Sequence, residues 1–245
     1  MLTRKCRFAL HFSLLIGSVL SIAPPFACPG SPPLPASAGS AAESQPAPTS
    51  VVRLTLRVYN YAHVDAVSLA RSEKVAAQAF ENVGIQLVWM DCPVPKTHSM
   101  TYPACQSDMG LRDLVLRILP RHMALQLAAR DEPLGSAQTC PESEPACELS
   151  VFYHRVDELA VAGYREDRIL GYVIAHEVAH ILIGPGHSEE GIMRRQWTRF
   201  DLQRISWGLL LDFTSDQSKQ LQYAVLRRMK QPVPDNPTRA NLIAP

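Results

Sequence analysis

The chain has 245 residues, of which 47% are hydrophobic and 19% are charged, and its formal net charge is +1. This composition is typical of a globular protein with enough apolar residues to form a core. The nearly balanced charge gives no indication of a nucleic-acid or anionic-membrane partner, and the length suits one or two domains.

The N-terminus has the three-part pattern of a secretory signal peptide. The basic start MLTRKCR precedes the apolar run FALHFSLLIGSVLSIA, and PPFA then ends on a small residue, while ASA at 36–38 is a second candidate cleavage site. We predict a signal peptide over 1–27 and export to the periplasm or the extracellular space. Two alternatives stay open. One is an uncleaved anchor, for which the run falls short of the ~20 residues that span a bilayer comfortably; the other is lipid modification of Cys28.

Proline, alanine and serine dominate residues 28–50, and residues 231–245 have a similar character. Such segments bury too little apolar surface to offset the entropy that they lose on ordering. We therefore predict a disordered tether over 28–50, a single domain over 51–230 and a disordered tail over 231–245. We expect a monomer without a stable membrane span once the signal peptide is removed.

The domain begins with a strand, a helix and a second strand. VVRLTLRVYNYAHV (51–64) alternates apolar and polar residues, which predicts a half-buried strand. Residues 65–84 have apolar residues at helical spacing, with Asp65 as the cap and Gly84 as the stop, and residues 85–92 return to a strand. Two strands joined through a helix are normally parallel neighbours.

The rest of the domain is predicted from periodicity and turn residues. In chain order we expect a strand at DLVLRILP, an ambiguous segment MALQLAA, a loop over the acidic and Pro-rich residues 131–148, a strand at LSVFYHRV, a long apolar helix at DRILGYVIAHEVAHILI, and helices over 197–211 and 215–231. Ser215 or Asp216 is the expected cap of the last helix. The order predicts an α/β or α+β domain, in which a small mixed, twisted sheet packs on a central helix and C-terminal helices follow.

Four cysteines lie in this domain, at positions 92, 105, 140 and 147. An even number in an exported protein favours two disulfides. Three pairings are possible, and pairing of sequence neighbours, Cys92–Cys105 and Cys140–Cys147, would close two Pro-rich loops. A metal site is the alternative, but no pair has the two-residue spacing of a zinc knuckle.

Two histidines and a glutamate lie close together on the long apolar helix, in HEVAH (176–180). Residues four apart on a helix differ by about 40° around the axis and about 6 Å along it. His176 and His180 therefore project from one face and can reach one ion at ~2.0–2.1 Å. Glu177 is displaced by one residue, near the ion's open position. The spacing predicts two metal ligands with a neighbouring base.

The third ligand has to come from outside the helix, because two protein ligands leave zinc underbound. A Gly-Pro-Gly turn at 184–186 ends the helix and can bring His187 back to the ion. We predict a Zn²⁺ site made by His176, His180 and His187, with Glu177 as the base. In the alternative, two buried histidines are hydrogen-bonded and Glu177 forms a local ion pair, an arrangement that is costly without strong partners.

HEVAHILIGPGH followed by GIM resembles the zinc-binding core of the metzincin metallopeptidases, whose pattern is His-Glu-x-x-His-x-x-Gly-x-x-His followed by a Met-turn. The resemblance implies a metzincin-like or zincin-like fold in which His176, His180 and His187 bind zinc, Glu177 is the base and Met193 underlies the ligands. It also implies an edge strand before the active-site helix that aligns an extended peptide, for which LSVFYHRV is the candidate.

The sequence departs from the family pattern in two ways. His180 and His187 are seven residues apart rather than six, with one extra residue near Ile183 that the Gly-Pro-Gly turn can absorb. Met193 also follows the third histidine after only five intervening residues, sooner than in many members. The match is therefore specific to the active site and not to one subfamily.

The activity that this resemblance implies is hydrolysis of peptide bonds in a peptide or protein substrate. Zinc lowers the pKa of its bound water towards ~7 and polarises the scissile carbonyl, while Glu177 takes the proton and passes it to the leaving amine. Two other classes remain. One is a non-catalytic exported protein that keeps zinc as a structural or binding device, against which Glu177 argues; the other is a metal-dependent hydrolase of a non-peptide bond.

The sequence does not assign a specific role to several further polar and charged residues. Four histidines without ligand spacing are expected on the surface or in the core: His63, His98, His122 and His154. His154 lies on the predicted substrate-facing strand, and Ser188 and Glu189 are candidates to orient the free ring nitrogen of His187. A basic patch follows the Met-turn and either binds substrate carboxylates or is a solvated helix face: Arg194, Arg195, Arg199 and Arg204.

Overall fold

The computed structural model describes residues 52–94, 102–127 and 133–231. The predictions for the signal peptide, the tether, Cys28, His98 and nearly all of the C-terminal tail lie outside these residues. No helix in the described ranges has the length and apolar character needed to cross a membrane.

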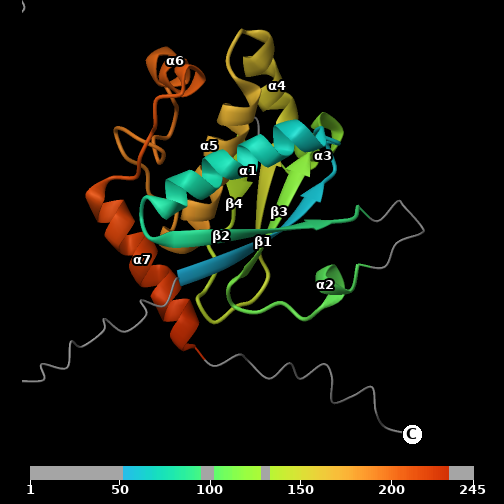
Figure 1. Ribbon diagram of the computed structural model, residues 1–245, viewed down its shortest axis with the longest axis vertical. Helices are drawn as coiled ribbons and strands as arrows, with labels where there is room; N and C mark the ends of the chain where they lie inside the picture. The colour runs from blue at the N-terminus through green and yellow to red at the C-terminus, as the bar shows by residue number, and fades with distance from the viewer. Residues whose placement is uncertain (1–51, 95–101, 128–132, 232–245) are drawn as a thin grey trace, which may run out of the picture. The chain divides into compact units, whose positions relative to one another are not determined.

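Within the described residues, five strands form one mixed sheet in the order β2-β1-β3-β5-β4 (Figure 1). The strands are β1 (Val52–Asn60), β2 (Ile85–Cys92), β3 (Asp113–Leu119), β4 (Gly135–Ala137) and β5 (Cys147–Phe152). β1 is parallel to β2 and β3, and β3 is parallel to β5, whereas β4 runs antiparallel to β5. The mixed sheet and the parallel pairing of β1 with β2 were predicted correctly.

The helices in the described part of the chain are α1 (Ala66–Glu81), α2 (Pro103–Gln106), α3 (Arg121–Leu127), α4 (Tyr153–Val161), α5 (Glu166–Ile183), α6 (Arg199–Trp207) and α7 (Ser215–Lys230). α1 and α5 contact each other and, with Leu54, Leu56 and Val58 of β1, form the main hydrophobic core. Figure 1 shows α1 along one side of the sheet and α2 on the other. The expected packing of the sheet on the long apolar helix is therefore present.

The predicted boundaries hold best where capping chemistry is clear. Asp65 caps α1, and its carboxylate accepts the backbone N–H groups of Val67 and Ser68. At α7 the cap is Thr214 rather than the expected Ser215 or Asp216, because the Thr214 hydroxyl accepts the backbone N–H of Gln217 in a capping box. All three consecutive residues are good N-caps, so the sequence could not separate them.

The segment between β3 and α5 differs most from the prediction. Residues 131–148, predicted to be a loop, contain β4 and the start of β5. β5 ends at Phe152 and the chain continues as α4, so His154 lies on a helix and not on a strand. β5 also lies between β3 and β4, which makes β4, and not LSVFYHRV, the edge strand before α5.

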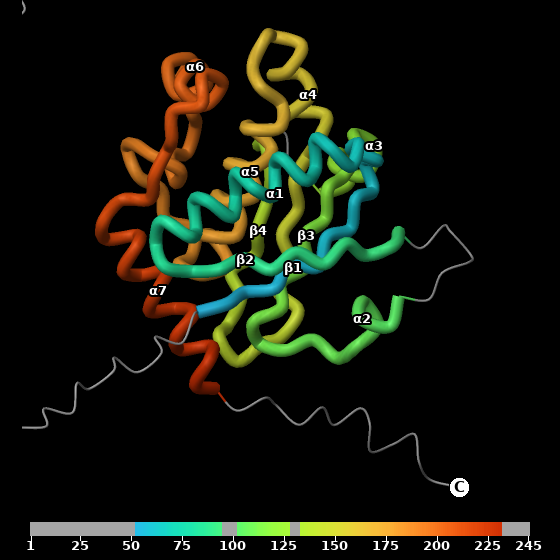
Figure 2. The backbone as a smooth tube through the Cα atoms, in the orientation of Figure 1, coloured from blue at the N-terminus to red at the C-terminus, as the bar shows by residue number. Residues whose placement is uncertain are grey.

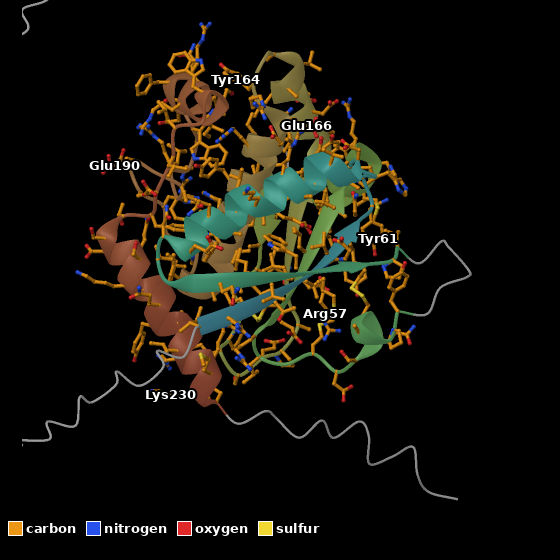
Figure 3. The ribbon with its side chains drawn as sticks, in the orientation of Figure 1. Arg57, Tyr61, Tyr164, Glu166, Glu190 and Lys230 are labelled. Atoms are coloured by element: carbon orange, nitrogen blue, oxygen red, sulfur yellow. A yellow bond between two sulfur atoms is a disulfide. The ribbon has the colours of Figure 1, made fainter. Side chains whose placement is uncertain are left out.

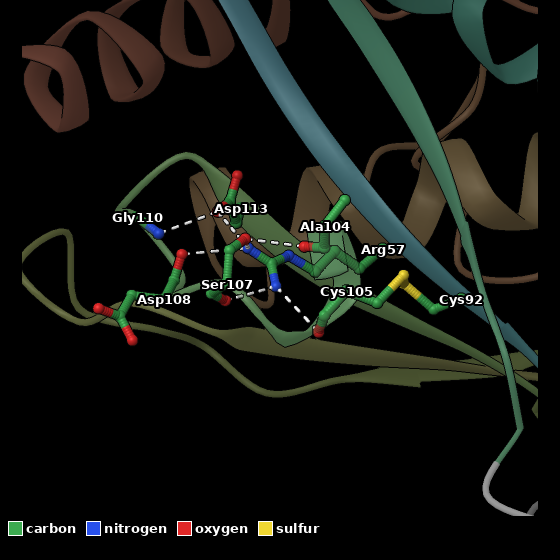
Figure 4. A network of polar contacts seen from close by, with 8 residues as sticks. All are labelled: Arg57, Cys92, Ala104, Cys105, Ser107, Asp108, Gly110 and Asp113. Carbon is green, nitrogen blue, oxygen red and sulfur yellow. Dashed lines mark hydrogen bonds and ion pairs between the residues drawn. A yellow bond between two sulfur atoms is a disulfide. The ribbon is translucent and has the colours of Figure 1, made fainter. Parts of the chain in front are cut away.

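Among the described cysteines, the disulfides Cys92–Cys105 and Cys140–Cys147 join those that are neighbours in sequence. Each lies beside a buried arginine. Arg57, 2% exposed, donates to the carbonyl oxygens of Cys105, Ser107 and Asp108 and pairs with Asp113 at 3.1 Å (Figures 3 and 4). Backbone carbonyls thus compensate for burial of the guanidinium, and they attach β1 to the segment from Cys105 to Asp108.

The second buried arginine, Arg228 on α7, is also 2% exposed. Its guanidinium donates to the carbonyl oxygens of Leu111 and Cys140 and lies 3.6 Å from the sulfur of Cys147. α7 is therefore attached to the hairpin of β4 and β5, which carries the edge strand next to α5.

Candidate metal centre

α5 carries the first two predicted ligands and the predicted base. Glu166 and Asp167 lie in its first turn, where negative charge is favourable next to the helix dipole, and apolar residues fill most of the remaining turns. Glu177 is buried, whereas His176 and His180 are half-buried. The helix therefore holds both imidazoles at the margin of the core and not in its interior.

Both imidazole rings are oriented by backbone carbonyl groups. The Nδ1 atom of His176 lies 2.7 Å from the carbonyl oxygen of Ile192, and Nδ1 of His180 lies 2.8 Å from that of Gly184. A carbonyl oxygen only accepts, so each Nδ1 carries the proton and each Nε2 presents a lone pair. The two Nε2 atoms are 2.9 Å apart.

His187 completes the cluster from beyond the end of the helix. α5 ends at Ile183, and Gly184 has a φ of +85°, a left-handed conformation that reverses the chain. The His187 ring centroid lies 5.5 Å from that of His176 and 4.8 Å from that of His180. One nitrogen of each ring lies within 4.8 Å of the others. The seven-residue spacing is thus accommodated by the Gly-Pro-Gly turn.

The turn that contains Met193 supports the segment of the third histidine. The backbone N–H of Arg194 donates to the carbonyl oxygen of Gly191, and the N–H of Ser188 donates to that of Met193, which joins this turn to the segment of His187. Met193 is fully buried. Figure 2 shows this part of the chain, in orange, as a loop between α5 and α6.

Gly191 is required for that turn. Its φ is +75°, and a Cβ at this position would lie 2.3 Å from the carbonyl oxygen of Asp212. The same carbonyl accepts the backbone N–H of Ile192, whose own carbonyl holds His176. Ile192 lies in the predicted Met-turn, but the roles of its carbonyl and of that of Asp212 were not expected, because both residues act through their backbone and leave no residue-type signal in the sequence.

Glu177 is 5% exposed and faces the edge strand. A Cβ on Gly135 of β4 would lie 2.7 Å from its Oε1 atom, so only glycine permits this approach. Burial raises the pKa of Glu177 to about 8, since the carboxylate loses hydration. A divalent cation at the histidines would favour the ionised form instead. The alternative of a local ion pair finds no support, because no cationic side chain among the described residues pairs with Glu177.

The donor set fits a borderline metal ion such as Zn²⁺. Burial lowers the pKa of His176 to about 4 and also lowers that of His187, so both rings are neutral near pH 7 and have lone pairs to donate. Two lone pairs facing each other at 2.9 Å repel unless a cation lies between them. Tetrahedral zinc separates its nitrogen ligands by about 3.3 Å, close to this distance.

The other residues considered from the sequence lie apart from this cluster. His63 follows β1, His122 is on α3 and His154 is on α4, and none of them is grouped with the three histidines. The Ser188 hydroxyl donates to the carbonyl oxygen of Glu190 and not to His187. Trp197, which no sequence motif singled out, places its ring 6.3 Å from that of His176, in an edge-to-face contact.

No protein-family model and no curated protein sequence matches this chain. Among solved structures it is similar to metalloproteinase-II from Bacteroides fragilis, with 8% identity and a TM-score of 0.48 over 72% of this chain and 54% of that one. It is also similar to archaemetzincin from Methanopyrus kandleri, with 16% identity and a TM-score of 0.43 over 74% of this chain and 98% of that one. The chain therefore spans about half the length of the Bacteroides protein, and the functional interpretation rests on the residues of the site itself.

Proposed function

We propose that this protein is an exported zinc-dependent endopeptidase of the metzincin type, in which His176, His180 and His187 bind zinc and Glu177 is the general base. The observation that carries the proposal is the convergence of three histidine nitrogens within 4.8 Å of one another, beside a buried glutamate on the same helix. Three protein ligands leave a fourth position for water or substrate, which is the arrangement of catalytic zinc sites.

The chemistry divides between the metal and the protein. Zinc, when bound, acidifies a water molecule and polarises the scissile carbonyl. The Glu177 carboxylate accepts a proton from that water and delivers it to the leaving amine. The bond between the carbonyl carbon and the amide nitrogen breaks, the water oxygen ends in the new carboxyl group, and its proton ends on the new amine. The close approach of Gly135 restricts the rotamers open to Glu177 and so keeps the carboxylate in place.

β4 is the candidate to align the substrate. It is one of the two edge strands of the described sheet and lies against Glu177 through Gly135. An edge strand has unpaired backbone groups that can bind an extended peptide as an additional strand. This role corresponds to the one that the metzincin resemblance assigns to an edge strand before the active-site helix.

Export is a separate part of the proposal. Two disulfides, as in this fold, persist in oxidising compartments and are rare in the cytosol. Expression of the full chain in a bacterial host followed by fractionation and N-terminal mass analysis tests it. We expect the protein in the periplasm or medium, beginning after residue 27 or residue 38. Recovery of the intact chain in the cytoplasm with free thiols would contradict export.

The enzymatic part is tested with purified protein and a library of quenched fluorescent peptides. We expect one zinc ion per chain and cleavage that a chelator stops and added zinc restores. The Glu177→Gln variant keeps zinc binding but loses activity by roughly 10²–10⁴-fold. Zinc binding without chelator-sensitive cleavage of any peptide would favour the non-catalytic alternative, and wild-type cleavage by Glu177→Gln would remove Glu177 from the mechanism.

A further inference from the structure

α6 and the turn after it carry four large apolar side chains that face solvent. Phe200 is 63% exposed, Trp207 71%, Leu209 50% and Leu210 46%. An apolar group of this size in one short stretch is uncommon on a protein surface unless it makes a contact. Figure 1 shows α6 at the upper left margin of the fold, away from the sheet.

These side chains lie on one face of α6 and on the turn that directly follows it. Phe200, Arg204 and Trp207 are spaced four and three residues apart, which places them on one face of α6. The guanidinium carbon of Arg204 lies 6.0 Å from the centre of the Phe200 ring, and its Nη2 donates to the carbonyl oxygen of Leu210 at 3.3 Å. Arg204 thus connects the helix to the turn that carries Leu209 and Leu210.

The outward orientation of this surface is fixed by packing on the opposite face of α6. Leu202 and Ile205 are buried in the core, and Thr198 begins the helix in a capping box with Asp201. The Ser206 hydroxyl accepts the backbone N–H of Arg165, which fixes α6 to the segment before α5. The apolar side chains therefore point to solvent from a helix whose opposite face packs against the core, and not from a helix that is detached from the fold.

Positive charge surrounds the apolar side chains. Residues 194–210 contain four arginines and one acidic residue, Asp201. Asp201 is 7% exposed and pairs with Arg194 at 2.8 Å. Arg199 and Arg204 remain as positive charge on α6 itself. The chain as a whole has a net charge of only +1, so its overall composition does not reveal this local excess of positive charge.

We propose that this α6 surface, made of Phe200, Trp207, Leu209 and Leu210 with Arg199 and Arg204, docks on an anionic lipid bilayer. Tryptophan, phenylalanine and leucine enter the boundary between headgroups and acyl chains, while arginines extend to lipid phosphates. A second copy of the chain fits less well, because a symmetric contact would bring the arginines of both copies together. The proposal does not depend on the peptidase activity.

The test measures binding of the full chain to vesicles of phosphatidylglycerol and, separately, of phosphatidylcholine by sedimentation at low ionic strength. We expect binding to phosphatidylglycerol at least roughly tenfold tighter, a blue shift of tryptophan emission and loss of that shift in Trp207→Phe. The double variant Phe200→Ser/Trp207→Ser should lose this binding. Residues 1–51 are the same in all variants, so a difference in binding between two variants is assigned to the substituted side chains and not to that segment.

Tyr223→Ser on α7 is the matched control, because Tyr223 is also 63% exposed but lies outside the α6 surface; it should bind like the wild type. Thermal unfolding checks that each variant is folded. Unchanged vesicle binding by the double variant, equal binding to both lipids, or no binding by the wild type would each overturn the proposal. So would concentration-dependent dimerisation that the double variant abolishes while vesicle binding persists.

Discussion

Gly135 of the edge strand lies so close to Glu177 that a Cβ at position 135 would be 2.7 Å from Oε1 of the glutamate and 2.8 Å from the carbonyl oxygen of Ser150. The carbonyl oxygen of Ser150 is a backbone atom, so movement of the Glu177 side chain alone would not make room for a Cβ at position 135. The strand β4 and the proposed base therefore fix each other's position.

We expect Gly135→Ala to lower kcat by roughly 10–100-fold, since the added methyl group displaces the Glu177 carboxylate or moves β4, and small misplacements of catalytic groups have effects of this size. Zinc content should stay at the wild-type value. Steady-state kinetics and metal analysis measure both. Gly110→Ala is the control, because a Cβ there meets only the Asp113 carboxylate at 3.9 Å. A Gly135→Ala enzyme with the wild-type kcat would show that the contact between Gly135 and Glu177 does not affect catalysis.

Removal of His187 should reduce zinc affinity by more than the ~10–100-fold that is typical for loss of an outer hydrogen-bond partner, because a direct ligand is lost. Competition with a chromogenic chelator measures the affinity of His187→Ala. His122→Ala, which replaces an exposed histidine on α3, should bind zinc like the wild type. Equal affinities for the two variants would mean that His187 does not hold the metal.

Gly191→Ala should destabilise the fold by about 2–3 kcal/mol or more, since the new Cβ combines a left-handed φ with a clash against the carbonyl oxygen of Asp212. Gly163→Ala separates the two causes, because Gly163 has a φ of +96° but no atom within 4 Å of the position that a Cβ would occupy. Gly163→Ala should lower the free energy of unfolding by about 1–2 kcal/mol. Urea denaturation gives both values; equal losses would exclude a role for the Asp212 contact.

Asp201 should make stability fall in acid. Burial raises its pKa, but hydrogen bonds from Thr198 and the ion pair with Arg194 outweigh that effect and leave the pKa below its ordinary value of 3.8. A carboxylate with a lowered folded-state pKa stabilises the protein above pH ~3.8, and the contribution disappears as the pH falls through the folded value.

Asp201→Asn should therefore lose about 1 kcal/mol at pH 7, the usual weight of a capping interaction, and the difference from the wild type should shrink below pH ~3.8. Denaturation at pH 7 and pH 3 measures it. Asp216→Asn is the matched control, since the Asp216 side chain is 86% exposed and pairs with Lys219 at 3.7 Å. A difference for Asp201→Asn that does not change with pH would contradict this assignment.

The sequence alone was sufficient to predict the structure wherever the type and spacing of the side chains determine it. Alternation predicted β1, Asp65 predicted the start of α1, and the spacing of His176, Glu177 and His180 placed them together on one helix. The Gly-Pro-Gly turn indicated that His187 can return to the other two histidines, and the three rings do lie together although the family spacing is one residue shorter.

Prediction failed where the signal lies in the backbone or in tertiary contacts. β4 has only three residues, too few for any periodicity. The change from β5 to α4 at Tyr153 interrupts a segment rich in valine and aromatic residues, which favour strands, so His154 was placed on the wrong element. Gly135 carries no motif, and its importance follows only from what lies beside it in space.

The ring orientations of His176 and His180 depend on main-chain oxygens of Ile192 and Gly184 and on no side chain. Related chains could therefore carry another apolar residue that fits the core at position 192, where Ile192 is fully buried, and retain the same coordination geometry, provided that the bend is preserved. The residues around such a metal centre can diverge widely while its chemistry is retained, and comparison of amino-acid sequences alone would miss such related proteins.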